Sequence, residues 1–308
     1  MGSTRRQFVR TVLGSAAGAA LAGRGLFAQA PAAPIGVNHL SDSFAVLSGA
    51  GGNVSLVLGP EGLLMIDGGV PQRAEALARA VAGVDRRRIL VLFNTHYHFD
   101  HVGSNELLGR SPAMPKVRII AHENVKKRLG ERMQNEAFGT TFEPLAPEGL
   151  PTETFMTSGR VQWGDNRIDY SHVPPSHTDG DAFLFMEGEN VLITGDLFWM
   201  GRYPVIDYSA GGSLAAMVTA LDTMDRAIND STRIVPGHGP VATRAEMLAM
   251  RDTWGQINLA IETMVQQGRT VEEVIAAAPT RDWDAQLGTA SREGFIRQAY
   301  GGIRATRR

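Results

Sequence analysis

The sequence of 308 residues contains no cysteine. This absence excludes a disulfide framework, a thiol nucleophile, cysteine-ligated zinc and iron–sulfur clusters. Any metal site must therefore be built from histidine, aspartate and glutamate side chains. A long uninterrupted apolar run is also missing, because the uncharged run from Ser43 to Pro60 is broken by the glycine-rich residues 49–53. We expect neither a membrane-spanning helix nor a stable membrane anchor there.

An excess of positive charge is absent as well. The chain has 30 basic and 32 acidic residues, a formal net charge of −2. Residues 1–30 contain four arginines and no acidic residue, which leaves 26 basic and 32 acidic residues elsewhere, a net charge of −6. We therefore do not expect nucleic acid as a partner, and we expect the substrate to be a small molecule.

The first 30 residues have the pattern of an export signal. Arg5 and Arg6 precede an uncharged stretch from Thr11 to Gly23 that is rich in alanine and glycine, and Ala28-Gln29-Ala30 follows it. The arginine pair resembles a twin-arginine signal, which implies transport by the twin-arginine translocation machinery and a periplasmic or otherwise exported location. We expect residues 1–30 to be removed. The alternative is a short basic helix at the N-terminus.

The remaining residues, 31–308, are expected to form one catalytic domain with no linker between two similar halves. Apolar runs predict strands, and apolar residues at helical spacing predict helices. Strands are expected at 44–48, 54–58, 63–67, 88–94, 161–163, 167–173, 182–186, 191–194 and 233–235, and helices at 71–83, 213–227 and 244–267. Residues 124–160, with three prolines, are expected to be an irregular excursion, and residues from about 240 to 308 a helical C-terminal part. This pattern predicts an α/β fold with two packed sheets and helices outside them.

Polar clusters rich in histidine and aspartate follow several of these strands. The densest, Thr95-His96-Tyr97-His98-Phe99-Asp100-His101, places three of the eight histidines and one aspartate within six positions. The others contain His177, Asp196 and His238. Carboxyl ends of strands are where α/β folds place their ligands, and clustered imidazoles without partners have no packing benefit. The pattern predicts a metal site.

In this order, HxHxDH followed by a later His, a later Asp and a later His, the sequence resembles the metallo-β-lactamase-fold hydrolase superfamily over about residues 40–240. The resemblance implies a four-layer αββα sandwich. It also implies that one metal ion is held by His96, His98 and His177, a second by Asp100, His101 and His238, and that Asp196 bridges the two. Asp100 and Asp196 are then the expected catalytic carboxylates. The bridging aspartate is similar to that of glyoxalase II-like hydrolases, whereas class B β-lactamases usually carry Cys or Ser there.

Imidazole and carboxylate ligands favour zinc, with iron or manganese as alternatives, and two zinc ions are the expected cofactors. Two cations about 3.5–4 Å apart can share a water, lower its pKa towards neutrality and polarise a carbonyl or phosphoryl oxygen. The sequence has no GxSxG motif or glycine-rich phosphate loop that would indicate another mechanism.

The supporting residues of the site can also be predicted. Asp67, which ends a strand, is expected to hold the metal loop by hydrogen bonds, with a turn-forming role as the alternative. Asp179 and Asp181 are expected to order their loop rather than to bind metal. The remaining histidines are assigned to no metal: His39, His122 and His172.

The loop that follows Asp196 is expected to set specificity. Its candidate substrate contacts are Phe198, Trp199, Arg202, Tyr203 and Tyr208. Arg202 would bind a substrate carboxylate through a bidentate pair. The alternative is that Arg202 faces water or pairs with Asp207.

The favoured function is an exported dinuclear hydrolase that attacks an ester, thioester, lactone or amide carbonyl with metal-bound hydroxide. A metallo-β-lactamase is the first alternative, and a phosphodiesterase is another, although the acidic charge argues against nucleic-acid substrates. The alternative of a different class is a non-catalytic periplasmic metal-binding accessory protein. His98 argues against the diiron flavoproteins, which carry an acidic residue at that position of the motif.

Overall fold

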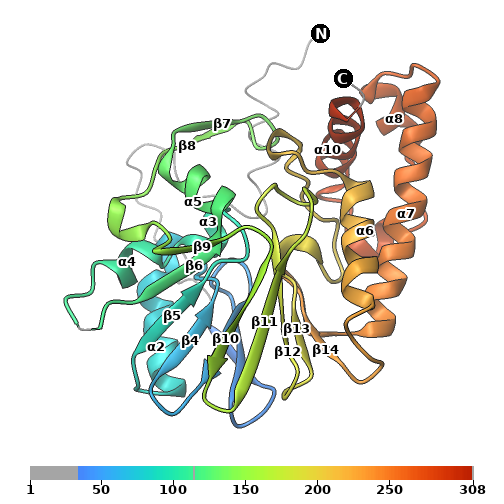
Figure 1. The fold of residues 1–308 in the computed structure, drawn as a ribbon. Helices are drawn as coiled ribbons and strands as arrows, with labels where there is room; N and C mark the ends of the chain where they lie inside the picture. The colour runs from blue at the N-terminus through green and yellow to red at the C-terminus, as the bar shows by residue number, and fades with distance from the viewer. Residues whose placement is uncertain (1–33, 114, 307–308) are drawn as a thin grey trace, which may run out of the picture.

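In the computed structural model, which describes residues 34–113 and 115–306, two sheets pack face to face with helices on both outer sides (Figure 1). The expected four-layer αββα arrangement is therefore observed. The expected export signal, residues 1–30, lies outside the described residues. Within the described part of the chain, no helix is both long and apolar enough to cross a lipid bilayer.

The first sheet contains seven strands. In spatial order they are β1 (Gly36–His39), β2 (Phe44–Ser48), β3 (Val54–Leu58), β4 (Leu63–Ile66), β5 (Ile89–Phe93), β6 (Arg118–His122) and β9 (Glu153–Phe155). The pairs β1–β2, β2–β3 and β3–β4 are antiparallel. The pairs β4–β5, β5–β6 and β6–β9 are parallel. Ile66 lies opposite Phe93 at the carboxyl ends of β4 and β5. The residues that follow these two strands therefore begin side by side.

The second sheet contains six strands. In spatial order they are β10 (Ser158–Trp163), β11 (Asn166–His172), β12 (Ala182–Met186), β13 (Val191–Ile193), β14 (Arg233–Val235) and β15 (Ala242–Thr243). All neighbouring pairs are antiparallel except β13 and β14, in which Ile193 lies opposite Val235. The loops that carry Asp196 and His238 therefore leave the sheet from adjacent strands.

The helices form the two outer layers. Those of the first half are α2 (Ala74–Val84), α3 (Phe99–Val102), α4 (Asn105–Gly109) and α5 (Glu123–Gly130). Those of the second half are α6 (Leu214–Asp225), α7 (Arg244–Gln266), α8 (Val271–Ala277), α9 (Asp284–Leu287) and α10 (Arg292–Ala305). Helix α7 begins with a capping box, in which the Thr243 hydroxyl accepts from the Glu246 N–H and the Glu246 carboxylate accepts from the Thr243 N–H.

Three apolar layers hold the four structural layers together. On β5, Leu92 packs towards α2 while Phe93 faces the second sheet, and on β13 Leu192 packs towards α6 and α7 while Ile193 faces the first sheet. Neighbouring side chains of a strand point to opposite faces, so a continuous apolar run is needed where both faces are covered. The largest fully buried side chain, Trp254 of α7, lies in the layer beneath the second-half helices.

The expectation of an irregular excursion at residues 124–160 was wrong. This segment contains most of α5, a hairpin of β7 (Met133–Asn135) and β8 (Thr140–Phe142), strand β9 and the start of β10. Strands β7, β8 and β9 have only three residues each. This length is too short for an alternation of apolar and polar residues to be recognised in the sequence. We refer to residues 133–142 as the β7–β8 hairpin, which extends towards α10 in Figure 1.

Candidate metal centre

The polar clusters that follow the strands converge at one edge of the two sheets. The segment His96–His101 follows β5 and enters α3, and Asp67 follows the neighbouring strand β4. From the second sheet, His177 lies in the loop after β11, Asp196 in a short 3-10 helix after β13, and His238 in the loop after β14. Parallel neighbours explain this convergence, because their carboxyl ends meet at the same edge.

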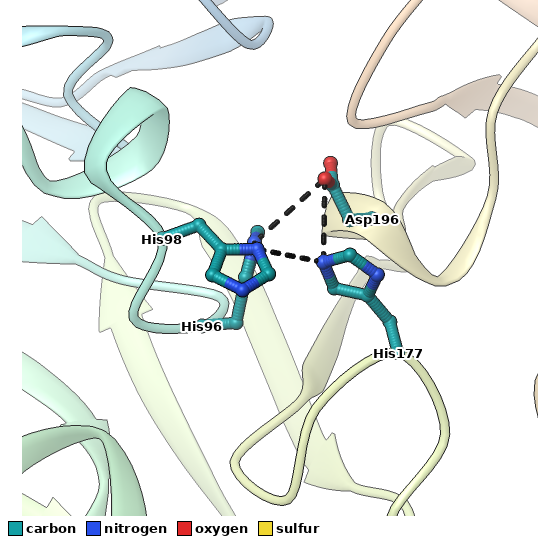
Figure 2. A group of neighbouring side chains, drawn as sticks. All are labelled: His96, His98, His177 and Asp196. Atoms are coloured by element: carbon teal, nitrogen blue, oxygen red, sulfur yellow. Dashed lines mark hydrogen bonds and ion pairs between the residues drawn. The ribbon is translucent and has the colours of Figure 1, made fainter. Parts of the chain in front are cut away.

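Four side chains form the first group of donors (Figure 2). His98 Nδ1 lies 3.2 Å from His96 Nε2 and 2.9 Å from His177 Nε2. Asp196 Oδ2 lies 3.8 Å from His96 Nε2 and 3.5 Å from His177 Nε2. Three imidazole nitrogens and one carboxylate oxygen therefore surround a common point, the donor set of a tetrahedral zinc site.

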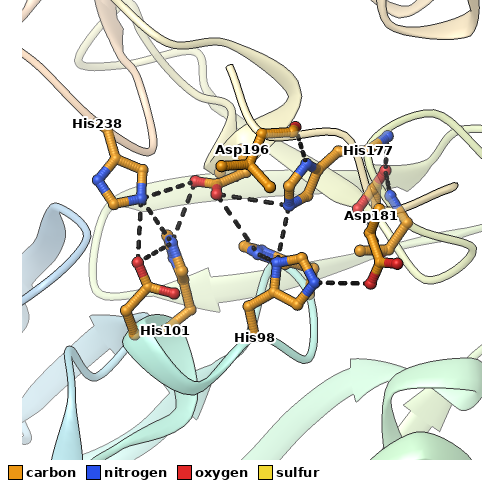
Figure 3. Close-up of polar contacts among 12 residues, drawn as sticks. His98, His101, His177, Asp181, Asp196 and His238 are labelled. Atoms are coloured by element: carbon orange, nitrogen blue, oxygen red, sulfur yellow. Dashed lines mark hydrogen bonds and ion pairs between the residues drawn. The ribbon is translucent and has the colours of Figure 1, made fainter. Parts of the chain in front are cut away.

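Three further side chains form the second group. His238 Nε2 lies 3.2 Å from Asp100 Oδ2 and 3.4 Å from His101 Nε2. Asp196 Oδ1 lies 3.1 Å from His101 Nε2 and 3.5 Å from His238 Nε2. Figure 3 shows His101 and His238 on one side of Asp196 and His98 and His177 on the other.

Asp196 thus directs one oxygen to each group. The carboxylate is 3% exposed, and its Oδ1 is a buried atom with no hydrogen-bond partner among the described residues. An unpaired buried oxygen is costly unless a cation or donor meets it. The orphaned oxygen and the convergent nitrogens fit a pair of divalent cations with Asp196 between them.

The electrostatics of the first group favour neutral imidazoles. Burial, together with the neighbouring His101, lowers the pKa of His96 well below its usual value. Burial likewise lowers the pKa of His177, against the attraction of Asp196. A neutral imidazole keeps the lone pair that a metal ion requires.

The second group is held by opposite charges. Burial would raise the pKa of Asp196, but His101 and His238 lower it well below the usual range. Burial opposes ionisation of Asp100 too, yet the same histidines hold its pKa at about 2. Burial would lower the pKa of His238, but Asp196 and Asp100 raise it to about 9. Protons therefore neutralise these carboxylates when no cation does, and a bound metal replaces them.

Among the described residues, four of the five donor imidazoles, all but His238, have a second contact on the other ring nitrogen, as His101 and His177 illustrate. Asp67 Oδ2 lies 2.8 Å from His101 Nδ1 and also accepts from the Thr95 hydroxyl at 2.8 Å. The Val205 carbonyl lies 2.9 Å from His177 Nδ1. Such partners fix the tautomer and the ring plane of a metal-binding histidine. The role expected for Asp67 agrees with this geometry.

Asp207 orients the His98 ring in the same way, a role that was not predicted from the sequence. Its Oδ2 lies 3.0 Å from His98 Nε2, accepts from Asn135 Nδ2 at 2.7 Å and accepts from the Tyr97 hydroxyl. Asp207 is fully buried. It lies 109 positions from His98 in the sequence, so no local spacing could reveal the contact.

Loop-ordering contacts agree with the roles expected for Asp179 and Asp181. Asp181 Oδ2 accepts from the N–H groups of His177 and Thr178 at 2.7 and 2.8 Å. Asp179 forms a bidentate pair with Arg128 of α5 at 2.6 and 2.7 Å. Neither carboxylate belongs to the two donor groups found among the described residues.

Two glycines and one asparagine allow the loops to approach this closely. A Cβ at Gly52 would overlap the His101 ring, and one at Gly237 would overlap Asp196 Oδ1. Asn53 Nδ2 donates to the carbonyls of Pro236 and Gly239 at 2.9 and 2.8 Å, which clamps the loop that carries His238. Sequence reasoning missed all three positions, since close approach leaves no local pattern.

The histidines expected to bind no metal lie outside both donor groups. His39 lies on the exposed strand β1. His122 and His172 stack on each other, with ring centroids 3.9 Å apart and planes at 19°. Their Nε2 and Nδ1 atoms face the carbonyls of Met156 and Asp181, respectively.

Two of the expected substrate contacts are instead core residues. Phe198 is fully buried and packs near Trp254. Tyr203 is 2% exposed, stacks on Phe295 and donates its hydroxyl to Asp284 Oδ1 at 2.7 Å. Phe198 has extended backbone angles, so its side chain and that of the next residue point to opposite sides. Closeness in sequence to Asp196 therefore did not place these rings in a pocket.

The other three expected substrate contacts, Trp199, Arg202 and Tyr208, lie in three different environments. Trp199 stacks on His238, with centroids 4.0 Å apart, and buries one face of this candidate ligand. Tyr208 is half-buried and packs against Gly301 of α10. Arg202 is exposed, and the alternative pairing with Asp207 is not observed, because Asp207 binds His98, Tyr97, Asn135 and Ser209.

Known proteins share this sequence pattern and fold. A family model described as the metallo-beta-lactamase superfamily matches residues 47–238. A probable metallo-hydrolase of Methanocaldococcus jannaschii is 26% identical over 203 residues, 64% of this chain and 91% of that protein. A hydroxyacylglutathione hydrolase of Gloeothece citriformis is 27% identical over 157 residues, 49% of this chain, and this match spans half of that protein.

Solved structures show the same fold at low sequence identity. A metallo-beta-lactamase from Pontibacter korlensis superposes with a TM-score of 0.58 and 17% identity, over 72% of this chain and 99% of that one. A sec-alkylsulfatase from a Pseudomonas species superposes with a TM-score of 0.62 and 14% identity, over 87% of this chain and 49% of that one. Since the family model covers more than half of the sequence, the chain belongs to the metallo-beta-lactamase superfamily.

Proposed function

We propose that the protein is a metal-dependent hydrolase that holds two cations, zinc by preference, and cleaves an ester, thioester, lactone or amide. The observation that carries this proposal is Asp196, whose two oxygens face two separate groups of donors. His96, His98 and His177 would hold one cation, and Asp100, His101 and His238 the other. Iron or manganese would fit the same donors less well than zinc.

Bound at this site, two cations would supply Lewis acidity and an activated water. The side chains of the chain supply the remaining requirements. Asp196 lies between the two groups and would keep them at a fixed separation. Of the two ligand carboxylates, that of Asp100 is the more exposed, at 19%, and it would be the one to exchange protons with the water and the leaving group.

The bridging position also narrows the substrate class. An aspartate rather than a cysteine occupies it, which resembles glyoxalase II-like hydrolases more than class B β-lactamases. The relatives named above include a hydroxyacylglutathione hydrolase, a thioesterase by reaction type. We therefore favour esters and thioesters over β-lactams.

A panel of substrates on zinc-loaded protein tests this proposal. Ester, thioester, lactone, amide, β-lactam and alkyl sulfate substrates are compared, with metal content measured by elemental analysis. We expect two metal ions per chain and turnover of at least one acyl substrate. Asp196→Asn should lose both metal and turnover, whereas Asp165→Asn, an exposed aspartate of the β10–β11 turn, should change neither. Full metal content without turnover on any substrate would favour the non-catalytic alternative.

A further inference from the structure

Solvent reaches the candidate centre mainly from one side. Five ligand side chains are no more than 3% exposed, whereas those of Asp100 and His238 are 19% and 12% exposed. A substrate must therefore approach past these two residues. Phe99, next to Asp100 in the chain, is 37% exposed and offers an apolar ring to solvent.

The β7–β8 hairpin extends this apolar surface to the centre itself. Phe99 stacks on Phe142 of the hairpin, with centroids 6.4 Å apart and planes at 28°. The ring centroids of Phe142 and Phe138 lie 6.1 Å apart. The Phe138 and His98 rings meet edge to face, with their centroids 5.0 Å apart. These three phenylalanines, which we name the aromatic wall, form a chain of ring contacts from the exposed Phe99 to the candidate ligand His98.

The hairpin is held in this position from both sides. Asn135 donates to Asp207 Oδ2 at 2.7 Å, the same oxygen that faces His98. On the other side, Gln298 of α10 donates to the Ala137 carbonyl at 3.4 Å and accepts from the Ile206 N–H at 3.0 Å. The wall is thus built on fixed contacts and not on an unsupported loop tip.

The two arginines nearest the wall are paired with acidic partners. Arg132 pairs with Glu143 at 2.9 Å across the hairpin, and both side chains face solvent. Arg128 lies over the Tyr97 ring and is bound bidentately by Asp179. Neither arginine is therefore free to bind a substrate anion, and the three phenylalanines offer apolar contact.

We propose that the aromatic wall, with Phe138 as its central residue, is the specificity element of this enzyme and receives a hydrophobic acyl group of the substrate. This inference rests on the proposed hydrolase function and names its substrate class. The wall begins at a ligand histidine, so the carbon chain of an acyl group whose carbonyl reaches the candidate centre would lie against it. Long-chain or aromatic acyl esters and thioesters are then preferred over acetyl ones.

Two measurements on zinc-loaded protein test the wall. Hydrolysis of 4-nitrophenyl octanoate and acetate compares acyl groups with one leaving group, and calorimetry compares binding of the carboxylates octanoate and acetate. Phe138→Ala should lower the octanoyl-to-acetyl ratio of kcat/KM, and the octanoate-to-acetate ratio of affinity, by about tenfold. Phe185→Ala, a half-buried phenylalanine of β12, is the matched control and should preserve both ratios. Phe138→Leu keeps an apolar side chain and should give an intermediate ratio if alanine impairs folding.

The outcomes distinguish a failure of the proposed wall from a failure of the proposed hydrolase function. Preferential octanoate binding that Phe138→Ala abolishes supports the wall even if neither ester is cleaved. Ester cleavage by the wild type without a preference for octanoyl over acetyl overturns the wall and leaves hydrolysis intact. An unchanged octanoyl-to-acetyl ratio in Phe138→Ala, or no binding of octanoate to the wild type, also overturns it.

Discussion

At the scale of single residues, the orientation of the ligands depends on side chains that do not face the metal centre. Asp207 is the clearest case, because one carboxylate oxygen meets His98, Tyr97 and Asn135. Burial would raise the pKa of Asp207, but His98 and the hydroxyl donors hold it below its usual value. The residue is therefore a buried anion that fixes the ring plane of His98.

We expect Asp207→Asn to lower the affinity of the first donor group for zinc by about 10–100-fold, since an amide no longer stabilises the oriented imidazole. Competition with a chromogenic chelator measures this change without any substrate. The affinity of Asp165→Asn serves as the reference. A zinc affinity equal to that of the wild type would remove Asp207 from the support of the centre.

The sequence reveals some of these residues and conceals others for a physical reason. Histidines within six positions after a buried strand must lie together, so the motif from His96 to His101 can be recognised directly. The partners Asp207 and Asn135 come from distant parts of the chain, a loop and the end of β7, and only packing brings them together. Phe198 shows the converse, because it lies next to the centre in sequence while its ring points into the core.

At the scale of elements, strand ends and helix starts determine where the site residues lie. The long helix α7 follows β15 without a connecting loop, and its capping box marks the turn from strand to helix. The strands of the core were predictable from apolar runs, and 44–48, 54–58 and 182–186 agree in both bounds. The three-residue strands β7, β8 and β9 were not, because their stability comes from pairing partners that the local sequence does not contain, whereas β14 was predicted at 233–235 with both bounds correct.

Thr243→Ala should destabilise the protein by about 1 kcal/mol, because the first turn of α7 loses its cap. For a chain of this size, the melting temperature should fall by about 2–4 °C, as measured by calorimetry. Thr263→Ala, which removes an exposed hydroxyl bonded to the Leu259 carbonyl within the same helix, should have a smaller effect. Equal shifts in both variants would mean that the cap contributes nothing specific.

At the scale of the whole molecule, the centre joins two sheets. Asp100 and His101 follow a strand of the first sheet, and His177, Asp196 and His238 follow strands of the second. The facing edges of the sandwich therefore share a cluster of buried charges. If this cluster holds cations, their removal would leave those charges to be neutralised by protons.

Chelation should accordingly lower the melting temperature. A ligand present at about 100 times its Kd stabilises the folded state by about 2.7 kcal/mol, so loss of bound metal should shift the transition by about 5–10 °C. Calorimetry with and without a chelator measures this shift. The same treatment of Asp196→Asn, in which metal binding is already impaired, should produce almost none. A large shift in that variant would point to an effect of the chelator elsewhere.

The proposed export belongs to this scale too, since twin-arginine transport carries folded cargo. Arg5→Lys combined with Arg6→Lys should leave the precursor in the cytoplasm, as seen by fractionation and immunoblotting. Arg10→Lys, a change to a neighbouring arginine outside the pair, should not. Undiminished periplasmic protein in the double variant would contradict the proposal.

The clamp that Asn53 places on the carbonyls of Pro236 and Gly239 has a consequence for the timing of assembly. During synthesis, Asn53 leaves the ribosome nearly two hundred residues before the loop it holds, and His238 is the last ligand to be made. The second donor group is complete only once loops of both sheets have met. We therefore expect that a second cation would be captured late, from the metal pool of the compartment in which the chain finishes folding.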